Sequence, residues 1–102
     1  MAVVEVDRQH SVTSSGSTPR IDGLTVREWT VYAETAAGST ATFQLQTARD
    51  VNSSTPAIPY GTVQNLGASS GVCLQFTGPS ILFARVSDAT STGTVTFRFI
   101  GN

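Results

Sequence analysis

Lysine is absent from this 102-residue sequence, and cysteine and histidine occur once each. The six basic residues are therefore all arginine, and charged residues make up only 13% of the chain, about half the usual quarter. The single cysteine, Cys73, excludes an intramolecular disulfide. The net charge of −1 gives no general attraction to nucleic acid or to an anionic membrane, so we expect neither as a partner.

Patterns of catalytic or metal-binding residues are equally scarce. His10 stands alone beside a Ser-rich stretch, and Cys73 lies in an apolar run without a basic neighbour, so a solvated histidine and a structural cysteine are the expected readings. CxxC, HExxH and P-loop spacings are absent. We therefore expect no enzyme and predict no catalytic residue, cofactor or metal ligand. The opening MAVVEVDRQH has no basic or long apolar region, so we expect no signal peptide.

The sequence is instead rich in hydroxyl side chains, with 12 serines and 15 threonines. Short β-rich runs alternate with Gly, Pro, Ser and Asn clusters, and no window has the apolar spacing of a helix. This pattern predicts an all-β protein: a single antiparallel β-sandwich, jelly-roll-like or Ig-like, of seven to eight strands. We expect residues 1–20 to form a first strand and a Ser/Thr/Gly-rich extended N-terminal arm, and residues 21–102 to form the β-sandwich domain.

Alternation of apolar and polar residues predicts which side chains face the core. In the run 40–47, Ala41, Phe43 and Leu45 should point inward. Trp29 should be buried and Tyr32 should lie on the opposite, polar side of its strand. A bulge near residues 27–28 would bring the apolar residues on either side into phase. Residues 29–47 are predicted to form an antiparallel hairpin.

The sequence of the last two predicted strands indicates both core residues and residues of a subunit interface. Residues 81–87 and 94–100 are expected to form a closing hairpin, with Val95, Phe97 and Phe99 in the core. The strand 81–87 is apolar on both sides, which is typical of a doubly covered strand or of a subunit interface. Arginine is common in interfaces. The predicted interface residues are Arg8, Arg20, Ile81, Phe83, Arg85, Arg98 and Ile100.

The segment 48–61 contains two prolines and has no clear period, and long loops of this kind often make contacts. Its candidate contact residues are Asp50, Asn52 and Tyr60. The oxygen side chains around Asp50 resemble half of a calcium loop, but the glycine and the distal glutamate are missing, so an Asx-rich turn is the expected structure. Exposed tyrosines beside Asn and Asp keep a glycan site open as an alternative.

Three segments together resemble small β-sandwich virion structural proteins of tailed bacteriophages, of the capsid decoration (cement) or head-fibre type. They are ATFQLQTARD, the Gly-preceded VCLQFTGP, and SILFARVSDATSTGTVTFRFIGN. The resemblance covers roughly residues 25–100. The chain departs from the pattern after "LQ", where RDVNSSTPAIPYG replaces an Asp-Gly-Trp turn. This family has no catalytic residues to transfer.

The resemblance implies a non-enzymatic protein located in the virion and assembled in the host cytoplasm. A capsid decoration protein would bind the major capsid protein lattice, or another virion protein, and stabilise the shell as a homo-oligomer, with a trimer favoured. The arm would order against the capsid, and its removal is expected to abolish binding and leave the domain folded. The alternative is a host-recognition or carbohydrate-binding module of a phage tail or head fibre.

Overall fold

The computed structural model describes residues 5–13, 16–23, 25–36, 40–48, 58–67, 70–89 and 94–102. The regular elements of these residues are all strands, and none of these residues belongs to a helix long and apolar enough to cross a membrane. The strands are β1 (Val6–Thr13), β2 (Gly16–Ser17), β3 (Ile21–Asp22), β4 (Glu28–Thr35), β5 (Ala41–Thr47), β6 (Ile58–Pro59), β7 (Gln64–Leu66), β8 (Gly71–Thr77), β9 (Ile81–Ala89) and β10 (Thr94–Gly101).

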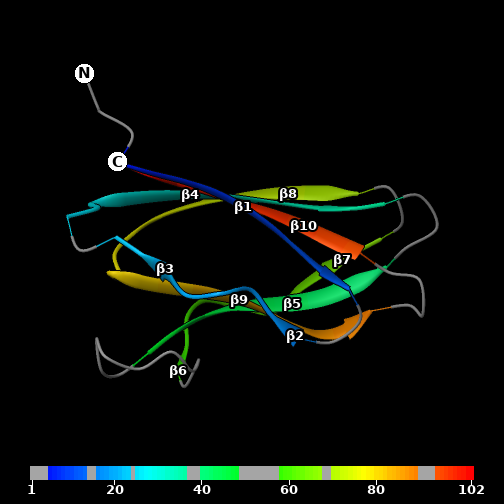
Figure 1. Cartoon of the computed structure of the whole chain (residues 1–102). Coiled ribbons are helices and arrows are strands. Elements are labelled where there is room, and N and C mark those ends of the chain that lie inside the picture. Colours follow the sequence, from blue (N-terminus) through cyan, green and yellow to red (C-terminus); the bar gives the residue numbers. More distant parts are fainter. Residues whose placement is uncertain are drawn as a thin grey trace.

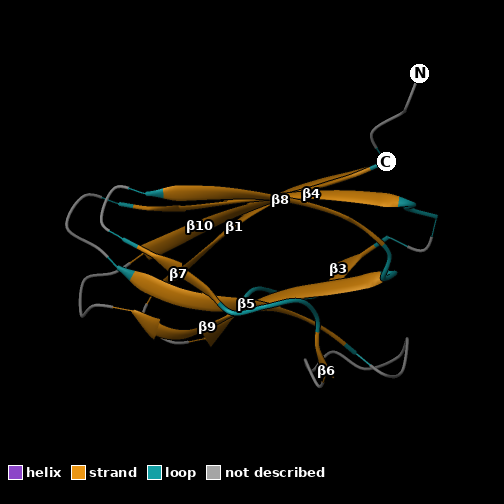
Figure 2. Ribbon diagram, turned by 180° about the vertical axis from the view of Figure 1, so that it is seen from behind, coloured by secondary structure: helices purple, strands orange, loops and turns teal. Residues whose placement is uncertain are grey.

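These strands form two antiparallel sheets that face each other, which confirms the predicted sandwich (Figure 1). One sheet has the order β1-β10-β4-β8. The other has the order β2-β9-β5-β6, with β3 also paired to β9 and β7 also paired to β5. Seen from behind, the two layers lie one above the other and the segment with β6 lies on the outer side of the second layer (Figure 2).

The inward side chains of both sheets make one hydrophobic core, as their alternation predicts. Phe97 of β10 contacts Phe43 of β5 edge-on, with ring centroids 5.0 Å apart, and so joins the two sheets. Trp29 is fully buried, and its indole N–H donates to the carbonyl oxygen of Pro79 at 2.7 Å. Because a buried indole needs an acceptor, this bond fixes the ring at one end of the core. The inward residues predicted for these strands, Val31, Ala33, Ala41, Leu45, Val95 and Phe99, are all buried.

The N-terminal segment differs from the predicted arm. β1 pairs with β10 over eight residues, from Val6 opposite Gly101 to Thr13 opposite Thr94. β2 pairs with β9, and the buried Thr18 hydroxyl accepts a 3.0 Å hydrogen bond from the Ala84 backbone N–H. Residues 6–13 and 16–18 are therefore parts of the two sheets of their own chain. Their polar sequence is compatible with this because β1 and β2 lie at sheet edges.

Both predicted hairpins are wrong. β4 and β5 lie in different sheets, and so do β9 and β10. β10 lies between β1 and β4, and β5 pairs with β9, β6 and β7. The chain crosses from one layer to the other between each predicted pair. Alternation predicts which side of a strand is buried, and both arrangements bury the same residues, so the pattern could not distinguish them.

Candidate functional site

The outward side of the sheet β1-β10-β4-β8 is a broad surface with few charges. We call it the outer face and define it by Gln9, Tyr32, Glu34, Thr96 and Arg98. The pairing register brings these residues from three strands into two adjacent rows, with Gln9 opposite Arg98 opposite Tyr32, and Thr96 opposite Glu34. Tyr32 is 41% exposed and is one of the two large hydrophobic residues on the surface of the described chain. An exposed tyrosine among polar groups, here Gln9 and Thr96 with the charged Glu34 and Arg98, is typical of a protein contact.

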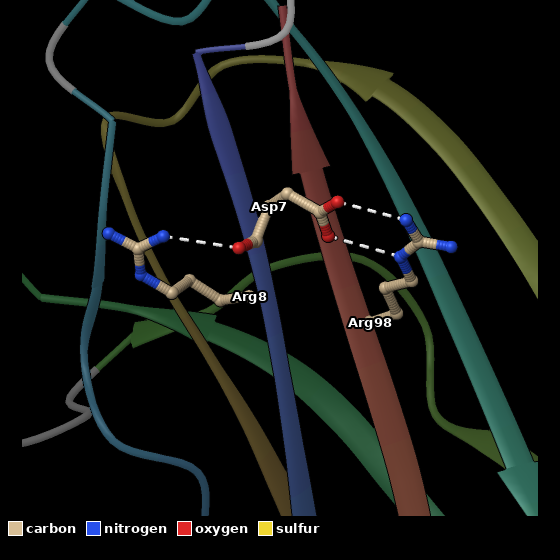
Figure 3. Close-up of polar contacts among 3 residues, drawn as sticks. All are labelled: Asp7, Arg8 and Arg98. Carbon is tan, nitrogen blue, oxygen red and sulfur yellow. Dashed lines mark hydrogen bonds and ion pairs between the residues drawn. The ribbon is translucent and has the colours of Figure 1, made fainter.

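Two of the charges on this surface, Arg98 and Asp7, are paired with each other. Arg98 donates two hydrogen bonds to the Asp7 carboxylate, at 3.0 and 2.9 Å, and Figure 3 shows the two side chains meeting above adjacent strands. The hydrogen bonds from Arg98, with the attraction of its charge, lower the pKa of the Asp7 carboxyl below its ordinary value of 3.8. The same contact raises the pKa of Arg98. Paired charges attract an anionic or cationic partner less strongly, so Glu34 is the charged group of the outer face that a partner would meet outside this pair.

Two shallow hollows flank the Tyr32 ring. One has a volume of about 240 Å³ and is lined by Gln9, Glu34, Thr96 and Arg98 together with Tyr32. The other, of about 320 Å³, lies between β4 and β8. A ring standing between two hollows offers edges and a face to an incoming side chain, which is the geometry of an interface anchor.

Two of the predicted interface residues, Arg8 and Arg20, line a second site at the open edge of the sandwich. This groove of about 300 Å³ lies between β1 and the segment that leads into β3. Arg8 donates to the Asp7 carbonyl oxygen at 3.1 Å, and Figure 3 shows its side chain pointing away from Arg98. Arg20 pairs with Asp22. His10 also lines the groove.

His10 lies far from Glu28, so these two side chains cannot act together in acid–base catalysis. His10 lies opposite Phe97, which lies opposite Ala33, so Glu28 is five positions further along β4. That spacing is about 17 Å along the strand, and Glu28 points outward, whereas His10 shares the inward side of β1 with Val6 and Val12. Asp50 lies outside the described residues. Where the chain is described, no three His, Cys, Asp or Glu side chains gather in a way that could hold a metal ion.

Tyr60 lies in a third, smaller groove beside β8. The groove has a volume of about 170 Å³ and is lined by Leu45, Leu74 and Phe76 among others. The Tyr60 ring lies 5.3 Å from the Phe76 ring, and its hydroxyl donates to the Thr77 carbonyl oxygen at 2.8 Å. The other predicted contact residues, Asp50 and Asn52, lie outside the described residues.

The seven predicted interface residues do not share one surface. Ile81 and Phe83 are 4% and 1% exposed within the chain, so their predicted place in an exposed interface is wrong. They occupy the outward side of β9 and show that this strand is covered on both sides. Arg85 is exposed on that same side, Arg98 lies on the outer face, and Ile100 is half-buried beside it. For the arginines and Ile100, a role in binding stays a prediction.

Comparison with known proteins gives no relative, since no family model, no curated protein and no solved structure matches the chain.

Proposed function

We propose that this protein is a non-enzymatic structural protein of a bacteriophage virion that decorates the capsid by binding the major capsid protein lattice. The observation that carries the proposal is the outer face, where an exposed tyrosine stands among Gln, Thr, Glu34 and an internally paired arginine. The sandwich fold agrees with what the sequence resemblance implies. The resemblance also implies a virion location, assembly in the host cytoplasm and no requirement for a cofactor.

The physical basis of such binding is a modest contact repeated many times. A lattice presents the same site in many copies, so a decoration protein that binds only the assembled shell stabilises it by mass action. Charged groups at the centre of an interface must lose water, whereas uncharged polar groups and an aromatic ring lose less on burial. The outer face combines an aromatic ring and uncharged polar groups with one charge, that of Glu34, and its Arg98–Asp7 pair enters an interface already hydrogen-bonded.

The test is co-sedimentation of the purified protein with shells of the phage that encodes it, in both procapsid and expanded forms. We expect saturable binding to at least one form. Tyr32→Ala should weaken that binding about tenfold, because truncating an interface tyrosine typically costs more than 1 kcal/mol. The matched control is Val63→Ala, since Val63 is 52% exposed and lies away from the outer face.

Failure of the protein to bind either shell form would overturn the proposed function. If the protein bound but Tyr32→Ala and Val63→Ala behaved alike, the capsid role would stand and the outer face would be rejected as the contact surface. Circular dichroism of both variants checks that the fold is retained.

A second candidate is a host-recognition module that binds a glycan, and the groove at Tyr60 is the observation that favours it. Tyr60 and Phe76, whose rings are tilted by 50° to each other, offer an apolar ring surface beside the side chains of Gln64 and Gln75. However, the Tyr60 hydroxyl is already bonded to Thr77, which leaves the site one polar group fewer for a sugar. Binding in a glycan array that is lost in Tyr60→Ala would favour this candidate, and an array without binding would reject it.

A further inference from the structure

Strand β8 leaves one of its two sides unpaired. Where the chain is described, its only ladder is with β4. Two backbone hydrogen bonds beyond its ends fix the alternation: Thr35 N–H donates to the Ser70 carbonyl oxygen at 2.9 Å, and Gly78 N–H donates to that of Arg27 at 3.3 Å. In an antiparallel pair, alternate residues point their backbone groups to the same neighbour. The groups that point to the open side are therefore those of Gly71, Cys73, Gln75 and Thr77.

From Gly71 to Gln75 this open side lacks the charges and prolines that normally protect a sheet edge, whereas its Phe76–Thr77 end is covered by Tyr60. The sequence of β8, GVCLQFT, contains no charge and no proline. The opposite edge of the same sheet, β1, carries Asp7, Arg8 and His10, and the outermost short strand of the second sheet, β6, contains Pro59. Natural proteins use such charges and prolines to prevent strands from adding to an edge. The unprotected edge of β8 is therefore available for pairing with another strand.

The inward side chains of β8 also remain partly uncovered. Val72, Leu74 and Phe76 pack against the core but are only half-buried, whereas the inward residues of β4 and β10 are fully buried. A strand added beside β8 would cover these three side chains and would gain hydrogen bonds to the open backbone groups. The added strand must then present apolar side chains on the same inward side.

A second copy of β8 meets these requirements. In a twofold pair the same strand of each copy meets its counterpart, so two charged strands would repel each other. β8 carries no charge, and this repulsion does not arise. The next charged residues on the outward side, Glu28 and Glu34, lie on β4. Across two β8 strands the two β4 strands are separated by about 14 Å, which is more than the screening distance at physiological salt. No repulsion opposes the contact.

One contact also selects the register. The Thr77 carbonyl oxygen already accepts from Tyr60, so the ladder open to a partner runs from Gly71 to Gln75, and its centre is Cys73. We propose that two copies of this chain pair through β8, antiparallel across a twofold axis, with Cys73 opposite Cys73. Gly71 then lies opposite Gln75, and Leu74 opposite Val72. The two four-stranded sheets join, so that two outer faces form one continuous surface.

This inference does not depend on the proposed function, because pairing through β8 takes place in solution without a capsid. It differs from the trimer that the sequence resemblance favours, since a threefold assembly needs two different surfaces in each contact and this register uses one surface twice.

The mass in solution is the first test. Sedimentation equilibrium should give twice the chain mass of 10.7 kDa. Cys73→Lys should convert the protein to a folded monomer, because it places two ammonium groups opposite each other, whereas Cys73→Ser should remain a pair. Gln75→Pro should act like Cys73→Lys, since the Gln75 N–H points to the open side and proline removes it. A monomeric or trimeric wild type, or an unchanged mass for folded Cys73→Lys, would overturn the proposal.

The register is tested by oxidation of single cysteines. Opposed hydrogen-bonded residues have Cα atoms about 5.5 Å apart, which is within the range that a disulfide spans. In the control, Cys73→Ser combined with Gln75→Cys, the two cysteines of a pair are displaced by four residues, or about 13 Å. We expect the wild type to form the intermolecular disulfide at least about tenfold faster than the control. Equal rates would contradict the register.

Discussion

Gly101 lies where three strands meet, and a single methyl group there tests the packing of the core. It is opposite Val6 on one side and Trp29 on the other. A Cβ atom at this position would lie 2.7 and 3.0 Å from the two methyl groups of Val26 and 3.3 Å from the Trp29 ring. Contacts below 3.0 Å do not occur in relaxed structures, so a neighbour must move. The Trp29 ring is fully buried and held by its bond to Pro79, so it cannot move freely.

We therefore expect Gly101→Ala to lower the free energy of unfolding by about 1–3 kcal/mol, the usual cost of overpacking a core. For a domain of this size, each kcal/mol lowers Tm by about 4–8 °C. The expected decrease is thus roughly 4–24 °C. This is a large part of the stability of a small domain, which is typically 5–15 kcal/mol.

The assay is thermal and urea unfolding of the wild type and four variants, of which one is the double variant Val26→Ala with Gly101→Ala. Gly67→Ala is the matched control, because nothing lies within 4 Å of a Cβ there, and its unfolding free energy should stay within about 0.5 kcal/mol of the wild type. Val26→Ala removes the two methyl groups that clash, so adding Gly101→Ala to it should cost much less than in the wild type. If Gly101→Ala and Gly67→Ala unfold at the same temperature, the described packing around Trp29 is incorrect.

Two further predictions concern the first strand. Deleting residues 1–13 removes β1, and burial of Val6 and Val12 alone contributes roughly 3–6 kcal/mol to stability. We therefore expect the shortened chain to lose its cooperative unfolding transition. A deletion variant that folds and unfolds cooperatively would mean that β1 is not part of the sandwich. NMR titration should place the pKa of Asp7 below 3.8 and return it toward that value in Arg98→Met. Because the pKa of Asp7 is lowered in the folded protein, the Arg98–Asp7 pair stabilises the fold fully above the pKa of the unfolded chain. This stabilisation is lost as the pH falls through the lower pKa of the folded protein. Identical Asp7 titrations in the wild type and in Arg98→Met would exclude the pair.

The faces of the strands could be predicted from the sequence, because burial alternates with a period of two. Phe43 and Phe97 illustrate this, since each was assigned inward and each is fully buried. The partners of the strands could not be predicted in this way. A hairpin within one sheet and a crossover to the other sheet bury the same side chains. Alternation therefore could not show that the chain crosses to the other sheet between β4 and β5 and between β9 and β10.

The local break before β4 also had a different cause from the one predicted. The phase change between Val26 and Trp29 was attributed to a bulge. In the structure Val26 precedes the strand, and its N–H donates to the Gly23 carbonyl oxygen in a turn. A bulge does occur, but in the pairing of β5 with β9, between Thr42 and Phe43.

The candidate sites were predictable only in part. Tyr32 was placed on the exposed side from its phase, and the structure confirms that side. The apolar outward residues of β9, Ile81 and Phe83, predict an interface, but in the structure other parts of the same chain bury them. The sequence does not show which face of a sheet its own chain covers. The open edge of β8 had a signal in its lack of charge, but an edge strand can be recognised only once the strand order is known.

The central claim of this account is that the protein binds an assembled capsid. The most direct measurement is the amount of protein that sediments with expanded shells of its own phage, as a function of protein concentration. If the proposed capsid binding is correct, we expect saturation at a fixed ratio to the major capsid protein, together with a higher disassembly temperature of the decorated shells. Protein that stays in the supernatant at every concentration, with both procapsids and expanded shells, would contradict it.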